Sequence, residues 1–458
     1  MGRHATRRRR LVVGSTLAAA SLLLVACGGG SGQAGGAGSA AATDPACKAY
    51  ADYQGHAGTK VSMYSSILSP EADSLQKSWS EFERCTGITI DYEGANDFES
   101  QLPVRVTGGN APDIAIIPQP GLLQRMVATG KVVEPPAAVK ANVEKYWNTA
   151  WKSYGSVNGT FYAAPMSANM KSLVWYSPKM FADAGLTIPK TWDEMMALSD
   201  KIAKMGKGKP WCGGIASGTA TGWPATDWLE QVVLRQAGPQ AYDQWISHKL
   251  PFNSPQIKQA MQTVANWMLN PRYVNGGFGD VRTIATTTFQ DAGRPILSGQ
   301  CWMLQQASFY GAQWPQGTKV AKDGDVFAFY LPPINPAVRT PVIGGGEFVT
   351  AFSDRPEVGV VQAYLSTPAW HASRVKVASG WVSANSGVDA SLYTDPIDAL
   401  SAQYLTSQDA TFRFDASDMM PAPVGAGAEW TQLTAWIAEG KSIDAVAQAI
   451  DAAWPKQQ

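Results

Sequence analysis

The sequence predicts an α/β fold organised as two lobes, and three observations support this prediction. Strand-like and helix-like segments alternate along the chain, which is typical of helices packed against a sheet. About 400 residues follow the first 44, and this length exceeds what one hydrophobic core usually organises. The strand candidates carry alternating or continuous apolar runs, as half-buried and buried strands do.

The N-terminal elements alternate regularly. In order they are a strand at 60–64, a helix at 69–85, a strand at 88–92, a helix at 98–107 and a strand at 113–117. Leu75, Trp79 and Phe82 recur at helical spacing in the first helix and give it an inward face. The last strand is apolar and rich in isoleucine, as a buried parallel strand should be.

The later elements carry helix-start signals. Residues 173–176 are predicted to form a strand, and Pro178 then occupies a first helical position, where proline is tolerated. Thr191 can cap the next helix, and Glu194, three residues on, completes a capping box. Ser442 is predicted to cap the C-terminal helix.

Residues 1–26 are predicted to be a lipoprotein signal peptide. Arginines at 7–10 precede an apolar stretch at 11–26, which is short for a membrane span. Cys27 ends a sequence that resembles the bacterial lipobox, whose thiol accepts a lipid; a plain signal peptide with a chance cysteine is the alternative. Residues 27–44 are mainly glycine, alanine and serine, which predicts a flexible tether. We therefore expect a protein anchored by lipid to the outer face of the cell membrane, with the export route, general or twin-arginine, left open.

The charge balance argues against a nucleic-acid partner. The whole chain carries 37 basic and 37 acidic side chains. Removal of the leader takes away five arginines and no acid, so 32 basic side chains remain against 37 acidic ones. A mildly acidic surface does not provide the basic patches that nucleic acids select.

Four cysteines follow Cys27: Cys47, Cys85, Cys212 and Cys301. An even number in an oxidising compartment predicts two disulfides, for which three pairings exist. No two cysteines are closely spaced and the four histidines lie far apart, so we expect no metal site. We also expect no cofactor.

Several segments, in their order and spacing, match one family. They are Gly108-Gly109-Asn110-Ala111-Pro112-Asp113, Tyr162-Ala163-Ala164-Pro165, Trp175-Tyr176-Ser177 with Ala184-Gly185-Leu186, Pro189-Lys190-Thr191-Trp192-Asp193-Glu194, and Gly344-Gly345-Gly346 before 348–352. The chain thereby resembles family 1 extracellular solute-binding proteins, the maltose-binding-protein-like receptors of carbohydrate ABC importers. Ser177 stands where the family usually has asparagine.

A narrower likeness is to alpha-glucoside-binding proteins. It rests on Thr221-Gly222-Trp223-Pro224, Asp227-Trp228-Leu229-Glu230, Tyr242-Asp243-Gln244-Trp245 and Thr288-Phe289-Gln290-Asp291-Ala292. The resemblance implies capture of a disaccharide or oligosaccharide, such as a glucose-containing disaccharide, and its delivery to ABC permease subunits in the membrane. It implies a binding protein and not an enzyme, and we expect it to act as a monomer.

The resemblance also implies the lobe boundaries. Two α/β lobes are joined by three crossovers around a central ligand cleft. Lobe one is expected at 45–165 and 326–380, and lobe two at 166–325 and 381–458. These boundaries favour the pairs Cys47–Cys85 and Cys212–Cys301, since each then falls within one lobe.

Aromatic residues are the first candidates for the ligand site. Sugars are bound by aromatic planes over their C–H faces and by polar groups around their hydroxyls. Trp223, Trp228 and Trp381 lie beside glycine, proline or polar residues and not in apolar periodic runs, so we select them as sugar platforms. Core packing is the alternative for each. Trp302, after Cys301, is a weaker candidate.

Polar candidates complete the predicted site. Asp97, followed by Phe98, comes after a strand and either accepts bonds from hydroxyls or caps the next helix. Asp227 lies four residues after Trp223 and could accept bonds from the same sugar, or it is a solvated acid at a helix start. Two glycines, Gly344 and Gly345, allow close approach of a ligand to the backbone, and Glu347 lies beside them, although a bulge or turn is the alternative.

Three other functions remain open at this point. A secreted glycan hydrolase would need two carboxylates about 5–10 Å apart across the scissile bond, and the chain has many acids. A lipoprotein could also bind glycans without transport. Relatives in this family bind glycerophosphodiesters as well, so the solute itself is undetermined.

Overall fold

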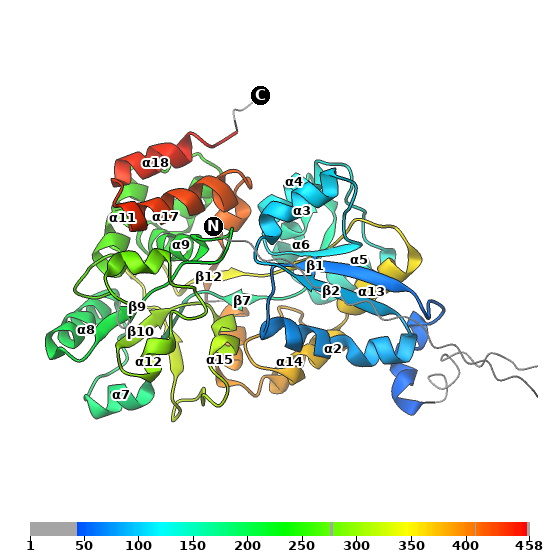
Figure 1. Ribbon diagram of the computed structural model, residues 1–458, viewed down its shortest axis with the longest axis horizontal. Helices are drawn as coiled ribbons and strands as arrows, with labels where there is room; N and C mark the ends of the chain where they lie inside the picture. Colours follow the sequence, from blue (N-terminus) through cyan, green and yellow to red (C-terminus); the bar gives the residue numbers. More distant parts are fainter. Residues whose placement is uncertain (1–43, 275–277, 408, 456–458) are drawn as a thin grey trace, which may run out of the picture.

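The computed structural model describes residues 44–274, 278–407 and 409–455. The predicted signal peptide, Cys27 and almost all of the tether lie outside the described residues. Two α/β lobes lie side by side, each built from segments that are far apart in the sequence (Figure 1). The predicted two-lobed α/β fold is confirmed.

Lobe one is built on a five-stranded sheet with strand order β2-β1-β3-β13-β6. Its strands are β1 (Lys60–Ser65), β2 (Thr89–Gly94), β3 (Ile114–Ile117), β6 (Ala163–Pro165) and β13 (Phe348–Ala351). β1 pairs in parallel with β2 and β3, whereas β13 returns antiparallel to β3. The helices of this lobe are α2 (Glu71–Thr86), α3 (Phe98–Thr107), α4 (Pro120–Val127), α5 (Ala137–Tyr146), α6 (Thr149–Tyr154), α13 (Pro356–Leu365) and α14 (Pro368–Val377).

Both faces of this sheet are buried, which explains the apolar runs in its strands. Val61 and Met63 of β1 pack on one face with Trp79 of α2. Tyr64 of the same strand points to the other face, where it packs with Phe98 of α3. A parallel sheet covered on both faces by helices requires apolar residues on both sides of each strand.

Lobe two contains a four-stranded sheet with strand order β11-β8-β10-β9. The strands are β8 (Leu173–Tyr176), β9 (Lys209–Cys212), β10 (Cys301–Gln305) and β11 (Phe327–Tyr330). Its helices are α7 (Pro178–Asp183), α8 (Trp192–Met205), α9 (Trp223–Ala237), α10 (Pro239–Ile246), α11 (Pro255–Met268), α12 (Arg294–Leu297), α17 (Trp430–Glu439) and α18 (Ile443–Asp451). One large hydrophobic cluster joins these elements.

A third, three-stranded sheet links the lobes. It has the order β14-β12-β7, with β7 (Asn169–Met170), β12 (Pro341–Gly345) and β14 (Thr411–Phe414). Figure 1 shows β7 and β12 between the two lobes. The chain crosses between lobes three times: from β6 to β7, from β12 to β13, and between α14 and α15 (Pro396–Leu405). These are the three crossovers expected.

Two expected boundaries are wrong in this arrangement, at 326 and at 381, since Trp381 packs in the core of lobe one. Residues 326–380 were assigned to lobe one, yet β11 pairs antiparallel with β8 at the edge of the lobe-two sheet. The chain re-enters lobe one only at β13. The sequence does not show which sheet β11 joins, because its pairing partner lies more than 150 residues away.

The predicted N-caps of α8 and α18 are confirmed. Thr191 accepts a hydrogen bond from the backbone N–H of Glu194, at 3.2 Å, and so caps α8. The Glu194 carboxylate accepts a hydrogen bond from the backbone N–H of Lys190 (2.7 Å). In an ideal capping box the donor would be the next residue, Thr191. Ser442 caps α18 through the backbone N–H of Ala445.

The cysteines lie in the expected pairs. Cys47 faces Cys85 with a Cα–Cα distance of 5.2 Å, and Cys212 faces Cys301 with a Cα–Cα distance of 5.6 Å. Both distances suit disulfide bonds. Each pair joins segments of a single lobe, so neither restricts relative movement of the lobes.

We expect all four of these thiols to be oxidised in the exported protein. A maleimide reagent applied to native protein without reductant should therefore label none of the four, and label all of them after denaturation and reduction. Labelling of two or more thiols in the unreduced, denatured protein would contradict the two-disulfide prediction. The Cys27→Ala variant is used for this labelling experiment, so that the thiol of Cys27 does not add to the count.

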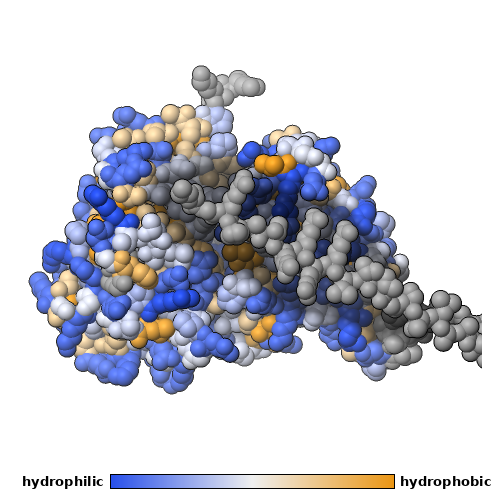
Figure 2. All heavy atoms as spheres, viewed as in Figure 1, coloured by the Kyte–Doolittle hydropathy of each residue, from blue (hydrophilic) through white to orange (hydrophobic). Residues whose placement is uncertain are grey.

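The visible surface is mainly polar. Figure 2 shows hydrophilic residues over most of one face, with hydrophobic residues scattered among them. Among the described residues, the exposed large hydrophobic side chains are Leu68, Val104, Ile188 and Leu297. Scattered residues of this kind are ordinary on protein surfaces. Across the described ranges, no helix is both long enough and apolar enough to cross a membrane.

Candidate ligand-binding site

A cavity of about 320 Å³ lies where the two lobes meet. Lobe one contributes residues after β1 and at the starts of α2 and α3, and lobe two contributes the start of α9 and the segments around 217, 289 and 309. The connecting segments supply Asn169, Lys171 and residues 345–347. A concave site of this size, with mixed aromatic and polar walls, is typical of a small-molecule site.

The lobes touch at one edge of this cavity. Both the backbone N–H (3.4 Å) and the side-chain hydroxyl (3.3 Å) of Thr219 donate to the backbone carbonyl of Asn96. Gly218 adopts a φ of 58°, and a Cβ atom there would lie 2.6 Å from the same carbonyl oxygen. Glycine therefore permits the close approach of lobe two to lobe one in this closed arrangement.

Lobe two provides an aromatic wall. Trp223 begins α9 and is half-buried at the cavity. Its ring packs edge-on against Phe289, with centroids 5.0 Å apart, and beside Phe309 at 5.9 Å. These neighbours hold the indole plane in place at the cavity wall, and Trp430 adds a further aromatic surface.

Lys171 lies at the centre of the polar side. It follows β7 in the first crossover and is 6% exposed. Its ammonium donates to Asp227 on α9 (2.9 Å) and to Asp415 after β14. The same ammonium lies 5.3 Å from the centroid of the Trp223 ring, within cation–π range. One lysine thus joins a crossover segment, lobe two and the third sheet.

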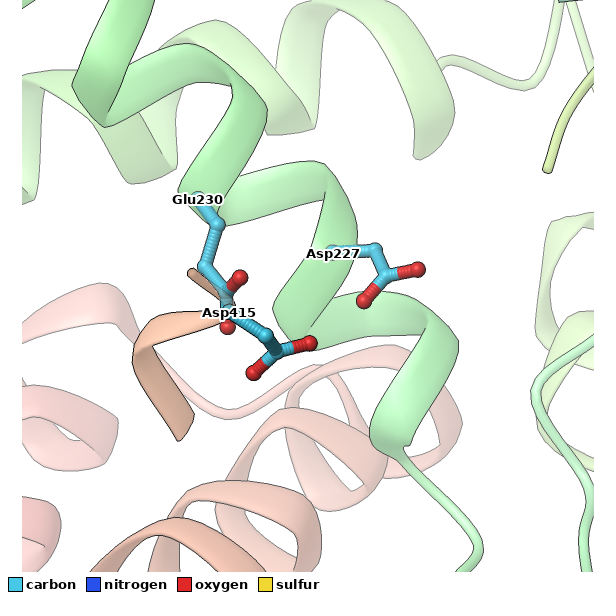
Figure 3. A group of neighbouring side chains, drawn as sticks. All are labelled: Asp227, Glu230 and Asp415. Carbon is cyan, nitrogen blue, oxygen red and sulfur yellow. The ribbon is translucent and has the colours of Figure 1, made fainter. Parts of the chain in front are cut away.

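A second carboxylate layer lies behind this pair. Glu230, one turn after Asp227 on α9, accepts from the backbone N–H of Ser417 (3.0 Å) and from the hydroxyl of Tyr242 (3.3 Å). Figure 3 shows Glu230 and Asp227 on the same helix, with Asp415 beside them.

This carboxylate group is the one place in the described residues where metal-ligand chemistry gathers. Oxygen atoms of Asp227, Glu230 and Asp415 lie within 4.8 Å of one another. The ammonium of Lys171 already bonds to two of the three. The ammonium of Lys171 therefore supplies the positive charge that a metal ion would bring, and these carboxylates do not require a metal.

Burial is the largest influence on the pKa values of the carboxyls around Lys171. Burial raises the pKa of Asp227 to about 7, although Lys171 acts in the opposite direction. Burial also raises the pKa of Glu230 and Asp418 well above their ordinary values. For Asp415, burial acts to raise the pKa, but Lys171 and the hydrogen bonds from the Asp418 backbone and Glu230 together outweigh it, so its pKa is lowered. The negative charge of the cluster is therefore concentrated on Asp415, paired with the lysine.

Acids on the lobe-one side behave similarly. Burial, reinforced by Glu71, raises the pKa of Glu347 to about 8. Burial likewise raises the pKa of Glu71 and of Glu99. These half-buried carboxyls face the cavity, so their protonation state bears directly on what the cavity binds.

We expect the protein in this closed arrangement to lose stability as pH rises from 6.5 to 8.5. A carboxyl whose pKa is raised in the folded state binds its proton more tightly there than in the unfolded state. Its contribution to the free energy of unfolding is therefore complete below the unfolded pKa, and it disappears as pH rises past the folded pKa. Glu347, near 8, and Asp227, near 7, titrate in this interval. Burial lowers the pKa of His371 to about 3. This histidine therefore loses its stabilising contribution only as pH falls below about 6.5, the pKa of an unfolded histidine, so it does not affect the interval from 6.5 to 8.5.

Melting temperature measured across this interval checks the expectation. Glu347→Gln removes one titrating group and should flatten the decline, whereas the same change at exposed Glu439 should leave it as in wild type. A melting temperature that rises steadily from pH 6.5 to 8.5 would contradict the raised pKa values.

Several predicted site residues are at the cavity. Trp223, Gly345 and Glu347 line it. Asp227 lies one layer behind the wall, 1% exposed, where it bonds Lys171 and so is neither a solvated acid nor free to meet a hydroxyl directly.

The other predicted tryptophans are in hydrophobic cores. Trp381 is 4% exposed and packs against Trp370, with ring centroids 5.6 Å apart, and against Arg374. Trp228 lies on the buried side of α9, and Trp302 donates its indole N–H to the backbone carbonyl of Lys207. The prediction of these three as sugar platforms is corrected to core packing, because each ring is enclosed by its own lobe.

The remaining predictions fall beside the cavity. Phe98 is fully buried in the core of lobe one. Asp97 holds the N-cap position of α3 but makes no capping bond, and its neighbour Asn96 lines the cavity instead. Gly344 pairs with Met170 in the third sheet, and a Cβ there would meet Phe412, so this glycine serves packing.

The cavity also contains residues that the sequence analysis missed. They are Lys171, Asp415, Asp418, Glu71, Glu99, Gln119, Asn169, Phe289, Phe309 and Trp430. A signal existed for Lys171, since it is a lone charge between the apolar residues Met170 and Leu173. The others lie in segments whose sequence resembles ordinary helix starts and loops.

Two lobes joined by three crossovers, with an aromatic and polar cavity between them, define a solute receptor. Residues 69–370 match the family model described as bacterial extracellular solute-binding protein. The chain belongs to this family, in its maltose-binding-protein-like branch that serves ABC importers.

Two relatives match over most of their length. The osmoprotective compounds-binding protein GgtB of Synechocystis sp. is 34% identical over 405 residues, which cover 87% of this chain and 93% of that protein. The alpha-glucosides-binding periplasmic protein AglE of Rhizobium meliloti is 34% identical over 401 residues, which cover 84% of each.

Solved structures support the fold. The bacterial solute receptor AcbH superposes with a TM-score of 0.73 at 19% identity, over 87% of this chain and 98% of that one. Maltose-bound MalE3 of T. maritima superposes with a TM-score of 0.64 at 16% identity, over 86% of this chain and 98% of that one.

Proposed function

We propose that this protein captures a sugar, an alpha-glucoside such as a glucose-containing disaccharide, and delivers it unchanged to the permease of an ABC importer. The observation that carries this proposal is the cavity between the lobes, with the Trp223 plane on one side and carboxyl groups around it. Aromatic planes cover the C–H faces of a sugar, while carboxyl and amide groups bind its hydroxyls. The relative named for alpha-glucosides supports this choice.

The size of the cavity favours a small ligand. About 320 Å³ is near the lower end of the range for ligand sites, which suits a disaccharide better than a long oligosaccharide. Binding between the lobes also explains capture. A ligand that contacts both lobes favours their closed arrangement, because its contacts are more complete there.

The proposal includes a lipid anchor at Cys27 and a monomeric receptor at the outer face of the membrane. Cys27→Ala should release the protein from the membrane fraction into the medium or the periplasm, because the remaining tether has no membrane affinity. Fractionation with an antibody measures this, and melting temperature should be unchanged. A Cys27→Ala protein that still sediments with membranes after processing would contradict the anchor.

A thermal-shift screen over maltose, trehalose, sucrose and longer glucans tests the ligand class, since a ligand that binds the folded state raises the melting temperature. We expect at least one neutral alpha-glucoside to stabilise the protein and to be recovered unchanged after prolonged incubation. Appearance of free glucose would indicate a hydrolase instead. Absence of stabilisation by every sugar would overturn the proposed ligand class.

A further inference from the structure

The wall of the cavity carries many more acidic than basic side chains. Of the described residues that line it, Lys171 is the one cation. Five lining residues from both lobes and the connecting segments carry carboxyl groups: Glu71, Glu99, Glu347, Asp415 and Asp418. Lys171 bonds one of them, Asp415, so four carboxyls face the cavity without a lining cation of their own.

The layer behind the wall does not balance this charge. It adds the carboxyls of Asp227, Glu230 and Glu429, all buried. Against these acids it adds one cation, Arg374, which attracts Glu71 and Glu347 from behind. Acidic groups therefore outnumber cations throughout the surroundings of the cavity.

The hydrogen-bonding groups show the same imbalance. Gln119, in the wall and 5% exposed, has a side-chain oxygen that accepts no hydrogen bond. One oxygen of Asp227 and both of Glu429 also lack donors. Among the fully buried side-chain atoms of the described wall residues, the indole N–H of Trp430 is the one donor without a partner. Among these fully buried atoms, acceptors without a partner outnumber donors without one, so a ligand that supplies donors suits the site.

Glu71 and Glu347 are the least committed of the acids. Glu71 begins α2 and Glu347 lies in the second crossover, so both are positioned by backbone that is fixed in the fold. Neither carboxyl accepts a hydrogen bond from another described side chain, although Glu347 accepts one from its own backbone N–H, and the two carboxyls repel each other. They are free to receive a donor group from a ligand.

We propose that this receptor selects its ligand by charge. It accepts glycosides without negative charge, favours a protonated amine in place of a hydroxyl beside Glu71 and Glu347, and rejects sugar phosphates, uronic acids and phosphodiesters. Glu71 and Glu347 are the specificity-determining residues. An ammonium supplies three donors and no acceptor, which suits a wall rich in acceptors. This inference rests on the proposed function, since it concerns the same cavity.

Three ligands that differ at one position test the inference: trehalose, trehalose 6-phosphate and 6-amino-6-deoxytrehalose. Maltose with maltose 6′-phosphate gives a second pair. Like charges placed together suppress binding, so we expect each phosphate to bind on the order of 100-fold more weakly than its parent in isothermal titration at pH 9, above the raised pKa of Glu347. The amine should bind at least as tightly as trehalose. A phosphate that binds within tenfold of its parent, or an amine that binds more than tenfold more weakly, would overturn the inference.

Glutamine variants test the two residues. Glu71→Gln and Glu347→Gln preserve shape and remove charge, so each should narrow the gap between neutral sugar and phosphate by about tenfold. Glu439→Gln, at a side chain 63% exposed in lobe two, is the matched control and should leave the gap unchanged. An unchanged gap in both cavity variants, with wild-type melting temperatures, would overturn the assignment to Glu71 and Glu347.

The charge inference and the proposed function can fail separately. If no neutral sugar binds, the proposed function is wrong. The charge inference is then decided by thermal shift with trehalose 6-phosphate, glucuronic acid and glycerophosphoglycerol. Stabilisation by any of these anionic probes would overturn it, and stabilisation by none would support it.

Discussion

Replacing Lys171 by methionine is expected to destabilise the protein by ~3–5 kcal/mol, the usual cost of removing one partner from a buried ion pair. Lys171 is 6% exposed, and its ammonium bonds both Asp227 and Asp415, each 1% exposed. Without the ammonium, two carboxyls remain buried with no cation beside them. They can respond by taking up protons, so the destabilisation should be larger at pH 8 than at pH 5.

Urea denaturation at the two pH values measures this effect. Lys60→Met is the matched control, because Lys60 pairs with Asp91 through side chains that are 64% and 57% exposed. Removing an exposed pair should cost about 0–1 kcal/mol. If Lys171→Met were no more destabilising than Lys60→Met at pH 8, the carboxyls would be neutral in the native protein and the central ion pair would not exist.

Trp223→Ala is expected to lower sugar affinity about tenfold to a hundredfold, with little loss of stability. A stacked aromatic ring contributes roughly 1–3 kcal/mol through buried area and contact with sugar C–H groups, and each 1.4 kcal/mol is tenfold in affinity. Trp223 is half-buried at the cavity, so truncation opens space toward the ligand and leaves the lobe-two core intact.

Trp381→Ala is the matched control for this change. Trp381 is enclosed by Trp370, His371 and Arg374 in lobe one, so its truncation leaves a core cavity that costs about 3–5 kcal/mol. Trp223→Ala should therefore lower the sugar affinity measured by isothermal titration and leave the melting temperature nearly unchanged. Trp381→Ala should lower the melting temperature and leave the affinity nearly unchanged. Comparable drops in melting temperature with unchanged affinity in Trp223→Ala would place Trp223 in the core as well.

Local sequence patterns predicted helices and strands because the interactions that form them join residues close together in the sequence. The helix at 98–107 and the start of α8 follow from periodicity and capping, which involve neighbours within four residues. The position of β11 did not follow, since an edge strand looks the same whichever sheet it joins. Its assignment to lobe two depends on pairing with β8 far away in the sequence.

The site could be predicted only in part, for a similar reason. Glu347 was found because it lies beside glycines that allow close approach of a ligand. Trp223 was found because glycine and proline beside it set it apart from apolar periodic runs. The same reasoning failed for Trp381, which follows Gly380 but packs into a core formed by α14. Asp227 was expected to touch sugar, yet its distant partner Lys171 holds it behind the wall. Long-range ion pairs leave little trace in a single sequence.

Small-angle X-ray scattering with and without ligand tests the central claim, capture of a sugar between two lobes that close on it. The structure has the lobes in contact through Asn96 and Thr219, so this closed arrangement should be the ligand-bound form. We expect the radius of gyration of the ligand-free protein to exceed that calculated from the structure and to fall to it when a neutral alpha-glucoside is saturating. A radius of gyration that does not change at saturating sugar would contradict capture by closure.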